Sequence, residues 1–246
     1  MQASERVVLL TGGARRLGAA TARELHRRGL SLVLHYRSSH DDALRLQDEL
    51  ERIRPGTVAL VAADILDEEA PRYLVDQALD RFGRLDMLVN NASSFYETPM
   101  SRASLGDWTD LLGTNLKAPF FLSQKASPHL AKAQGAIVNI VDIHAQRPLK
   151  GYPIYSIAKA GLAMLTQALA RELAPDIRVN GVAPGVILWA DGQVDPQERS
   201  TVLAGVPQGR MGTPEDIART VAFLLLDAPY ITGQILAVDG GRSVTL

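Results

Sequence analysis

Short apolar, β-branched runs alternate with longer stretches of helical periodicity, and this alternation constrains the fold more than any other feature of the sequence. The chain opens with an apolar run at 6–10, a glycine-rich turn at 11–18 and a helical stretch to about Arg28. Strands that alternate with helices of about 10–15 residues form right-handed βαβ units in a parallel sheet. The sequence therefore predicts one α/β domain over residues 1–246, a Rossmann-type doubly wound sheet of about seven parallel strands with helices on both faces.

The periodicity also predicts where the elements lie. The expected strands cover 6–10, 30–36, 58–62, 85–89, 135–141, 176–182 and 234–238, and the expected helices after the first cover 41–53, 68–82, 105–132 and a stretch that carries Tyr155 and Lys159. From Pro184 to about Gly212 we expect an irregular segment. A loop that long is normally a lid or disordered, and the apolar side chains of Trp189, Val202 and Leu203 favour a substrate lid over about 186–212.

Tyr155 and Lys159 are the first candidates for chemistry. They are four residues apart in a helical pattern, which places both side chains on one face, about 5–6 Å apart at Cβ. A nearby positive charge favours phenolate, so we expect Lys159 to lower the pKa of Tyr155 from its ordinary value of about 10. The alternative is an amphipathic helix that happens to carry one Tyr and one Lys, and the surrounding residues must decide between the two.

The turn at 11–18 predicts a dinucleotide site, because glycines let the backbone approach a pyrophosphate that the following helix N-terminus holds. The alternative is a glycine-rich turn without a ligand. The second strand ends in Arg37, Ser38 and Ser39, with no acid for the adenosine ribose. A guanidinium and two hydroxyls suit a 2′-phosphate, which favours NADP(H) over NAD(H) unless these side chains are simply solvated.

Polar residues also follow three other expected strands, at Asp64 and Ile65, at 90–93, and at Asp142. Ligands gather at the carboxyl ends of the strands in such sheets, although any one of these residues could merely cap a turn. Asn115 lies in the middle of an expected helix, a position that Asn disfavours, so we expect its side chain to bind backbone or water.

Composition excludes several other classes of protein. A formal net charge of -1 offers no electrostatic footprint for nucleic acid or an anionic membrane. No apolar run approaches the roughly 20 residues that span a bilayer, and the N-terminus lacks a cationic, then apolar leader, so a cytoplasmic protein is expected. The chain has no Cys, and its five His show no ligand spacing, so we expect no metal.

Together these motifs resemble the short-chain dehydrogenase/reductase superfamily over essentially the whole chain. Thr11-Gly12 to Gly18, Asn90-Asn91-Ala92, Asn115, Tyr155-x-x-x-Lys159, Pro184-Gly185 and Asp239-Gly240-Gly241 occur in that family's order and spacing. The resemblance implies NAD(P)(H) at the glycine turn, Tyr155 as proton donor, Lys159 on the nicotinamide ribose, Asn115 holding a water chain to Lys159, and a homotetramer.

Two departures from the general pattern narrow the resemblance. Position 16 is Arg where most members have Gly, and position 142 is Asp where most have a Ser that binds a substrate carbonyl. Both departures resemble pteridine reductases and dihydromonapterin reductases, as do 93–96 (Ser-Ser-Phe-Tyr), His35-Tyr36 and the Pro-Leu-x-Gly-Tyr run at 148–152.

Physical chemistry favours the same substrate class. Negative charge develops on a ketone oxygen during reduction and an ionised Asp142 would oppose it, whereas a pterin presents N–H donors and needs a proton at a ring nitrogen. Phe95 offers a flat face for the bicyclic ring, and Arg16 could reach its 4-oxo edge. The alternatives are a turn-forming Asp142 and a Phe95 that plugs the core.

The leading hypothesis is NADPH-dependent reduction of a dihydropterin (dihydrobiopterin or dihydromonapterin, with dihydrofolate also considered), with the proton from Tyr155 or from Asp142 through water. A second hypothesis is a carbonyl or 3-oxoacyl-carrier-protein reductase of the same superfamily. A third is a non-catalytic NADP sensor or scaffold, which has no need of the intact Asn115, Tyr155 and Lys159.

The expected catalytic residues are Asp142, Tyr155, Lys159 and Asn115. The expected cofactor contacts are Gly12, Arg15, Arg16, Leu17, Gly18, Tyr36, Arg37, Ser38, Ser39, Asp64, Ile65, Asn91, Ala92, Ser93, Tyr155, Lys159, Pro184, Gly185 and Val186. The expected substrate contacts are Arg16, Ser93, Phe95, Asp142, Tyr155, Leu188 and Trp189.

Overall fold

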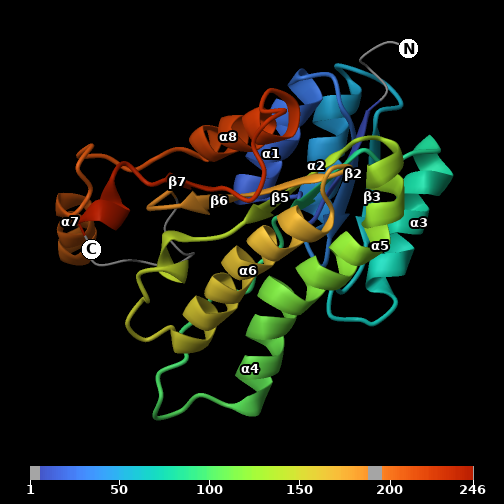
Figure 1. The fold of residues 1–246 in the computed structure, drawn as a ribbon. Coiled ribbons are helices and arrows are strands. Elements are labelled where there is room, and N and C mark those ends of the chain that lie inside the picture. Colours follow the sequence, from blue (N-terminus) through green and yellow to red (C-terminus); the bar gives the residue numbers. More distant parts are fainter. Residues whose placement is uncertain (1–5, 188–195, 246) are drawn as a thin grey trace.

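The sheet is fully parallel and has seven strands, as predicted, and their order is β3-β2-β1-β4-β5-β6-β7. The structure, a computed structural model, describes residues 6–187 and 196–245 (Figure 1). The strands are β1 (Val7–Leu10), β2 (Ser31–Tyr36), β3 (Val58–Ala62), β4 (Met87–Asn90), β5 (Ala136–Ile140), β6 (Arg178–Pro184) and β7 (Ile235–Val238). Most are continuously apolar because helices cover the sheet on both faces.

Two helical layers enclose the sheet (Figure 1). On one face lie α1 (Arg16–Arg27), α2 (His40–Glu51) and α8 (Pro214–Leu226), and on the other lie α3 (Ala70–Phe82), α5 (Ala118–Lys132) and α6 (Pro153–Glu172). Alternate residues of one strand pack against the two helical layers. In β1, Val8 and Leu10 pack on the side of α1, α2 and α8, and Val7 and Leu9 pack on the side of α3, α5 and α6. The fold thus contains two cores separated by one sheet.

The order of the strands reverses between β1 and β4. From β1 the chain proceeds outward to β2 and β3, then returns to β4 on the other side of β1 and continues to β7. The carboxyl ends stay level across this point, because Leu10 pairs with both Leu34 and Val89, and Asn90 pairs with Asn139. The crevice outside these ends is where ligands bind in open α/β sheets.

Three expectations about the helices need correction. The stretch 105–132 is not one α-helix: α4 (Leu105–Leu112) passes through a π-helical turn, η2 (Gly113–Lys117), into α5. The Asn115 side chain donates to the Leu111 carbonyl four residues earlier and so competes with the backbone ladder. The segment 186–212 is not irregular throughout, since it contains α7 (Pro196–Ala204).

The third correction is α8, a helix that the periodicity did not predict. Its start carries a recognisable signal: the Thr213 hydroxyl accepts from the Asp216 N–H, and the Asp216 carboxylate accepts from the Thr213 N–H. This reciprocal capping box with Pro214 in the first turn is readable in the sequence. Across residues 6–187 and 196–245, we find no helix with the length and apolar character to span a bilayer.

Gly18 is where the fold tolerates a side chain least. A Cβ there would lie 2.0 Å from the Gly12 carbonyl oxygen, and backbone cannot retreat as a flexible side chain can. We expect Gly18→Ala to lower the free energy of unfolding by at least about 2 kcal/mol, measured by urea denaturation. Gly106→Ala is the control, because its Cβ would meet only the Ser104 hydroxyl at 3.5 Å and should be neutral or stabilising. Equal stability of the two variants would contradict this account.

Candidate active site

The Thr11 hydroxyl joins β1 to β4 at the crevice. It donates to the Val89 carbonyl oxygen at 3.3 Å and accepts from the backbone N–H groups of Asn91 and Ala92 at 2.9 and 3.0 Å. The Asn91 amide donates in return to the carbonyl oxygens of Thr11 and Gly12, both at 2.9 Å. The turn after β1 and the turn after β4 are therefore held as one unit, and Thr11 is a residue that sequence reasoning did not single out.

His35 supports the same turn from β2 and was also not recognised as a site residue. Its Nδ1 accepts from the Gly12 N–H at 3.2 Å, so its Nε2 is the protonated nitrogen and donates to the Ala63 carbonyl oxygen at 3.1 Å. Burial lowers the pKa of His35, which keeps this neutral tautomer. The end of β3 and the glycine turn are linked through one imidazole.

The glycine turn has the features that a pyrophosphate requires. Gly12 has a φ of 61°, and a Cβ there would lie 3.0 Å from the Ala92 Cα, so the backbone is bare on that side. Arg15, the N-cap of α1, makes no side-chain capping hydrogen bond, whereas α4 and α8 both begin with full capping boxes. The first turn of α1 also carries no acid. An anion therefore fits the start of α1.

Arg16 adopts a backbone conformation that suits glycine. Its φ is 52°, in the left-handed region, where a side chain costs roughly 1–2 kcal/mol. This explains physically why glycine is the ordinary residue at this place in the turn. A strained position that keeps an arginine points to a function for the guanidinium.

The expected 2′-phosphate residues follow β2. Arg37 and Ser38 are exposed and Ser39 is the N-cap of α2, while Tyr36 is buried with its hydroxyl 2.7 Å from the His40 Nδ1. Two acids begin α2, and one of them, Asp42, forms ion pairs with Arg15 at 3.6 Å and with Arg45. The basic residues therefore share this surface with carboxylates.

Asp64 and Ile65 form a tight turn after β3. One Asp64 carboxylate oxygen accepts from the Leu66 N–H at 3.0 Å, and Ile65 is buried. β2 and β5 are separated by β1 and β4, which places their carboxyl ends roughly 14 Å apart at the usual strand spacing. The expected cofactor residues thus extend over several strands along one edge, as a dinucleotide requires.

Asp142, Tyr155 and Lys159 meet after β5. Tyr155 and Lys159 lie on α6, are 5% and 2% exposed, and point into the space beside the short 3-10 helix η3 (Ile143–Ala145), whose N-cap is Asp142. The Tyr155 hydroxyl donates to the Asp142 Oδ2 at 2.8 Å, and the Lys159 Nζ donates to the Ile140 carbonyl oxygen at 2.8 Å. The Lys159 Nζ also lies 5.6 Å from the centre of the Tyr155 ring. The predicted trio is therefore assembled.

The acid–base balance of this trio differs from the prediction. Burial raises the pKa of Tyr155 well above 10, and the charge and hydrogen bond of Asp142 raise it further, against a smaller opposing effect of Ser93. The expectation that Lys159 lowers the pKa of Tyr155 is wrong here, because the phenol donates to a carboxylate. Burial lowers the pKa of Lys159 itself to about 8, with Asp142 acting in the opposite direction. Asp142 thus stabilises the protonated forms of both neighbours.

Asn115 is fixed entirely by protein groups. Its Nδ2 donates to the carbonyl oxygens of Leu111 and Ser94 at 2.9 and 3.0 Å, and its Oδ1 accepts from the Ser93 hydroxyl at 2.6 Å. The expectation that Asn115 binds backbone is confirmed. Its water chain to Lys159 stays a prediction.

Phe95 forms an aromatic platform beside the trio. Its ring stacks on Tyr152 with centroids 4.6 Å apart and an interplanar angle of 10°, and it meets the edge of Tyr155 at 4.8 Å. Phe95 is 44% exposed, so it does not plug the core. A flat ligand could stack on the exposed side of Phe95, since Tyr152 covers the other. Tyr152 is a further residue that sequence reasoning did not assign.

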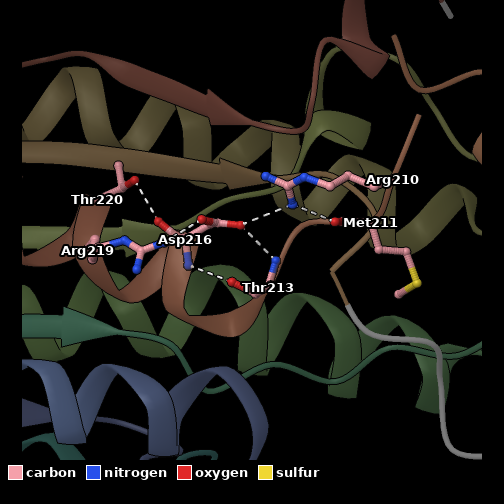
Figure 2. A network of polar contacts seen from close by, with 6 residues as sticks. All are labelled: Arg210, Met211, Thr213, Asp216, Arg219 and Thr220. Atoms are coloured by element: carbon pink, nitrogen blue, oxygen red, sulfur yellow. Dashed lines mark hydrogen bonds and ion pairs between the residues drawn. The ribbon is translucent and has the colours of Figure 1, made fainter. Parts of the chain in front are cut away.

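The ends of the expected lid are fixed on both sides. Gly185 donates to the Val238 carbonyl oxygen at 3.1 Å, and the Val186 carbonyl oxygen accepts from the Gly212 N–H at 3.0 Å. Figure 2 shows the next contacts, in which Asp216 accepts from Arg219 and the Thr213 N–H and pairs with Arg210 at 3.7 Å. Leu188 and Trp189 lie outside the described residues.

Comparisons with known proteins show which proteins this chain resembles. A family model described as enoyl-(acyl carrier protein) reductase matches residues 12–243. The chain is 38% identical to pteridine reductase 1 of Leishmania tarentolae, over 97% of this chain and 96% of the relative. It is 36% identical to 3beta-hydroxysteroid dehydrogenase 1 of Eggerthella lenta (97% and 94%) and 35% identical to the 3-oxoacyl-[acyl-carrier-protein] reductase FabG of Staphylococcus aureus (95% and 96%). These identities are too similar to choose among substrates.

The role of Asp142 in holding the Tyr155 proton can be measured. Asp142→Asn removes the negative charge, so we expect the pKa of Tyr155 to fall by roughly one unit or more. Ultraviolet titration of tyrosinate, with Tyr155→Phe as the blank, follows this change. Asp110→Asn is the matched control: its carboxylate accepts from Tyr96, whose pKa is raised to about 12, and Tyr155 should not respond to it. An unchanged Tyr155 pKa in Asp142→Asn would refute the assignment.

Arg16→Gly separates strain from function. Glycine adopts the positive φ without strain, which stabilises the folded state, but it also makes the unfolded chain more flexible, which partly offsets this gain. The net effect should raise the free energy of unfolding by about 0.5–1 kcal/mol. We expect affinity for NADPH to fall at least tenfold at the same time, measured by fluorescence titration. Gln134→Gly is the control, because Gln134 has a φ of 50° far from the crevice and should show only the gain in stability. If Arg16→Gly binds NADPH as tightly as the wild type, the Arg16 guanidinium does not contribute to cofactor binding.

Proposed function

Because the chain belongs to the short-chain dehydrogenase/reductase superfamily of oxidoreductases, which use NAD(P)(H), we propose that it is an NADPH-dependent pteridine reductase. It would reduce a dihydropterin, such as dihydrobiopterin or dihydromonapterin and by extension dihydrofolate, to the tetrahydro form. The observation that carries the proposal is the Asp142 carboxylate, which accepts the Tyr155 hydroxyl at 2.8 Å beside an exposed Phe95.

The residues of the crevice suit NADPH. The start of α1 with Gly12 and Gly18 would hold the pyrophosphate, Arg37, Ser38 and Ser39 the 2′-phosphate, and Asp64 and Ile65 the adenine. Asn91, Ala92, Lys159 and the Pro184–Val186 stretch would hold the nicotinamide end. When bound, the reduced nicotinamide supplies a hydride to the substrate.

The carboxylate favours a pterin over a ketone. A ketone oxygen becomes negative as it is reduced, and Asp142 next to Tyr155 would oppose that charge. A pterin instead brings ring N–H and amino donors, for which a carboxylate is the matching acceptor. Phe95, supported from behind by Tyr152, offers a stacking face to a bicyclic ring.

Two routes can deliver the proton that reduction of a ring imine requires. The first uses Tyr155, which holds its proton firmly because burial and Asp142 raise its pKa. The alternative route uses a water held by the Asp142 carboxylate: the water would give a proton to the ring nitrogen and take one back from solvent. Tyr155→Phe separates the routes: a loss of kcat as large as that of Asp142→Ala assigns the proton to Tyr155, and a small loss assigns it to the water at Asp142.

We further propose a lid and a homotetramer. The segment 186–212, which is fixed at Val186 and Gly212, would cover the bound substrate. Trp108, Phe120, Phe121, Ile157 and Met164 are each at least 40% exposed on α4, α5 and α6, and exposed apolar residues on neighbouring helices favour self-association. Sedimentation velocity of the purified protein measures the oligomeric state.

The assay uses purified protein, NADPH and dihydrobiopterin or dihydromonapterin, with turnover followed by the loss of NADPH absorbance. We expect pterin reduction with NADPH well above NADH, and a fall in kcat/KM of at least about 100-fold in Asp142→Ala. Asp142→Ser is a more specific test, because it introduces the hydroxyl that most members of the superfamily have at this position. We expect this variant to lose pterin reduction and to gain ketone reduction. No pterin turnover above that of Asp142→Ala would end the proposal.

The second candidate is a carbonyl or 3-oxoacyl-carrier-protein reductase. It is favoured by the 35% identity to the 3-oxoacyl-[acyl-carrier-protein] reductase of Staphylococcus aureus. This function predicts turnover of ketones or 3-oxoacyl thioesters that barely changes in Asp142→Ala. Pterin and ketone assays of the wild type and of Asp142→Ala therefore distinguish the two functions.

A further inference from the structure

A cavity lies beside the proposed cofactor site, between the turn after β3 and the start of α5. Its volume is about 190 Å³. Ile65, Leu66, Pro71, Ala118 and Phe121 form its apolar lining. None of the expected catalytic residues takes part in it. We propose that this cavity binds a compact apolar molecule of about one ring and that its occupancy controls affinity for NADPH.

The lining determines the class of ligand. Water gains little in an apolar cavity, and a cavity of roughly 150 Å³ lined by Leu, Ile and Phe stays dry and binds benzene. The charged members of the lining, Asp67, Glu68 and Lys117, are exposed to solvent, so they mark the outer side of the cavity rather than its apolar floor. A neutral hydrocarbon ring or a short branched alkyl group fits this environment.

The cavity touches both halves of the site. One wall is the turn that carries Asp64 and Ile65, and the other is the π-helical turn that carries Asn115. The walls meet where Gly113 faces Leu66, since a Cβ on Gly113 would lie 2.6 Å from the Leu66 Cδ2. A guest that fills the space contacts the Ile65 turn and η2 together and so favours the arrangement of both walls in which they face NADPH.

This preference gives the coupling a sign. We expect the guest to tighten NADPH binding roughly fivefold, and NADPH to tighten guest binding by the same factor, because coupling between two sites is reciprocal. The coupling rests on the proposed NADPH site, whereas binding of the guest to the ligand-free protein does not. The two can therefore fail separately.

Toluene is the probe. We expect saturable binding to the ligand-free protein, followed by calorimetry and by methyl NMR shifts, and a fivefold lower Kd for NADPH at saturating toluene. Ala118→Leu places a larger side chain in the cavity from a position that is only 4% exposed, and should weaken toluene binding more than tenfold and abolish the effect on NADPH. Urea denaturation of the variant checks that it folds.

A matched pair of phenylalanines provides the second test. Phe120 and Phe121 are neighbours on α5 with 40% and 42% exposure, and their rings pack edge to face at 5.1 Å, but only Phe121 lines the cavity. Phe121→Ala should weaken toluene binding at least threefold, and Phe120→Ala should leave it unchanged. Sedimentation of both variants separates this effect from any change of assembly.

Three outcomes overturn the inference: no saturable toluene binding, equal binding in wild type and Ala118→Leu, or toluene binding with no change in the Kd for NADPH. If the protein binds no NADPH in the absence of toluene, the proposed cofactor is wrong. The proposed coupling then fails as well. The toluene titrations of the ligand-free protein still show whether the cavity binds an apolar molecule.

Discussion

The crevice depends on the contact between Thr11 and Asn91. One hydroxyl and one amide connect the turns after β1 and β4 where the strand order reverses, and four of their five hydrogen bonds reach backbone groups of the opposite turn. The other links between the two halves of the sheet are the ladder between β1 and β4 and the packing of the two cores, and neither fixes the turns themselves. The glycine turn can leave its backbone bare for a ligand because the other side of the turn is fixed in this way.

Asp142 changes the electrostatics of an otherwise ordinary superfamily site. A hydroxyl at this position would leave Tyr155 and Lys159 as a phenol and an ammonium in a nearly dry space. The carboxylate adds a negative charge that holds protons on both, so the trio is arranged to keep protons and to accept N–H donors. One side chain makes this change in charge, while the surrounding strands and helices keep the arrangement of the fold.

Much of the fold and site follows from local patterns. Strands buried on both faces are apolar runs in the sequence, so each strand is predicted to within a few residues. The sequence also predicts that Asp142, Tyr155 and Lys159 lie together. Long-range polar contacts left no such pattern: Thr11 and His35 lie in sequence motifs, but their partners are known only once β1, β2 and β4 lie side by side. The pKa of Tyr155 was mistaken for the same reason, because helical spacing identifies its neighbour on α6 but not the acceptor of its proton.

The π-helical turn at Gly113–Lys117 places one extra residue between α4 and α5. The turn holds one residue more than an α-helix would need for the same rotation, so α5 keeps its phase and Leu122, Ala126 and Leu130 stay packed in the core with α3. Deletion of one residue there would restore an unbroken α-helix, in which a backbone N–H takes the Leu111 carbonyl that Asn115 now holds. The extra residue therefore serves the crevice rather than the core, because it frees a carbonyl oxygen to hold the Asn115 amide.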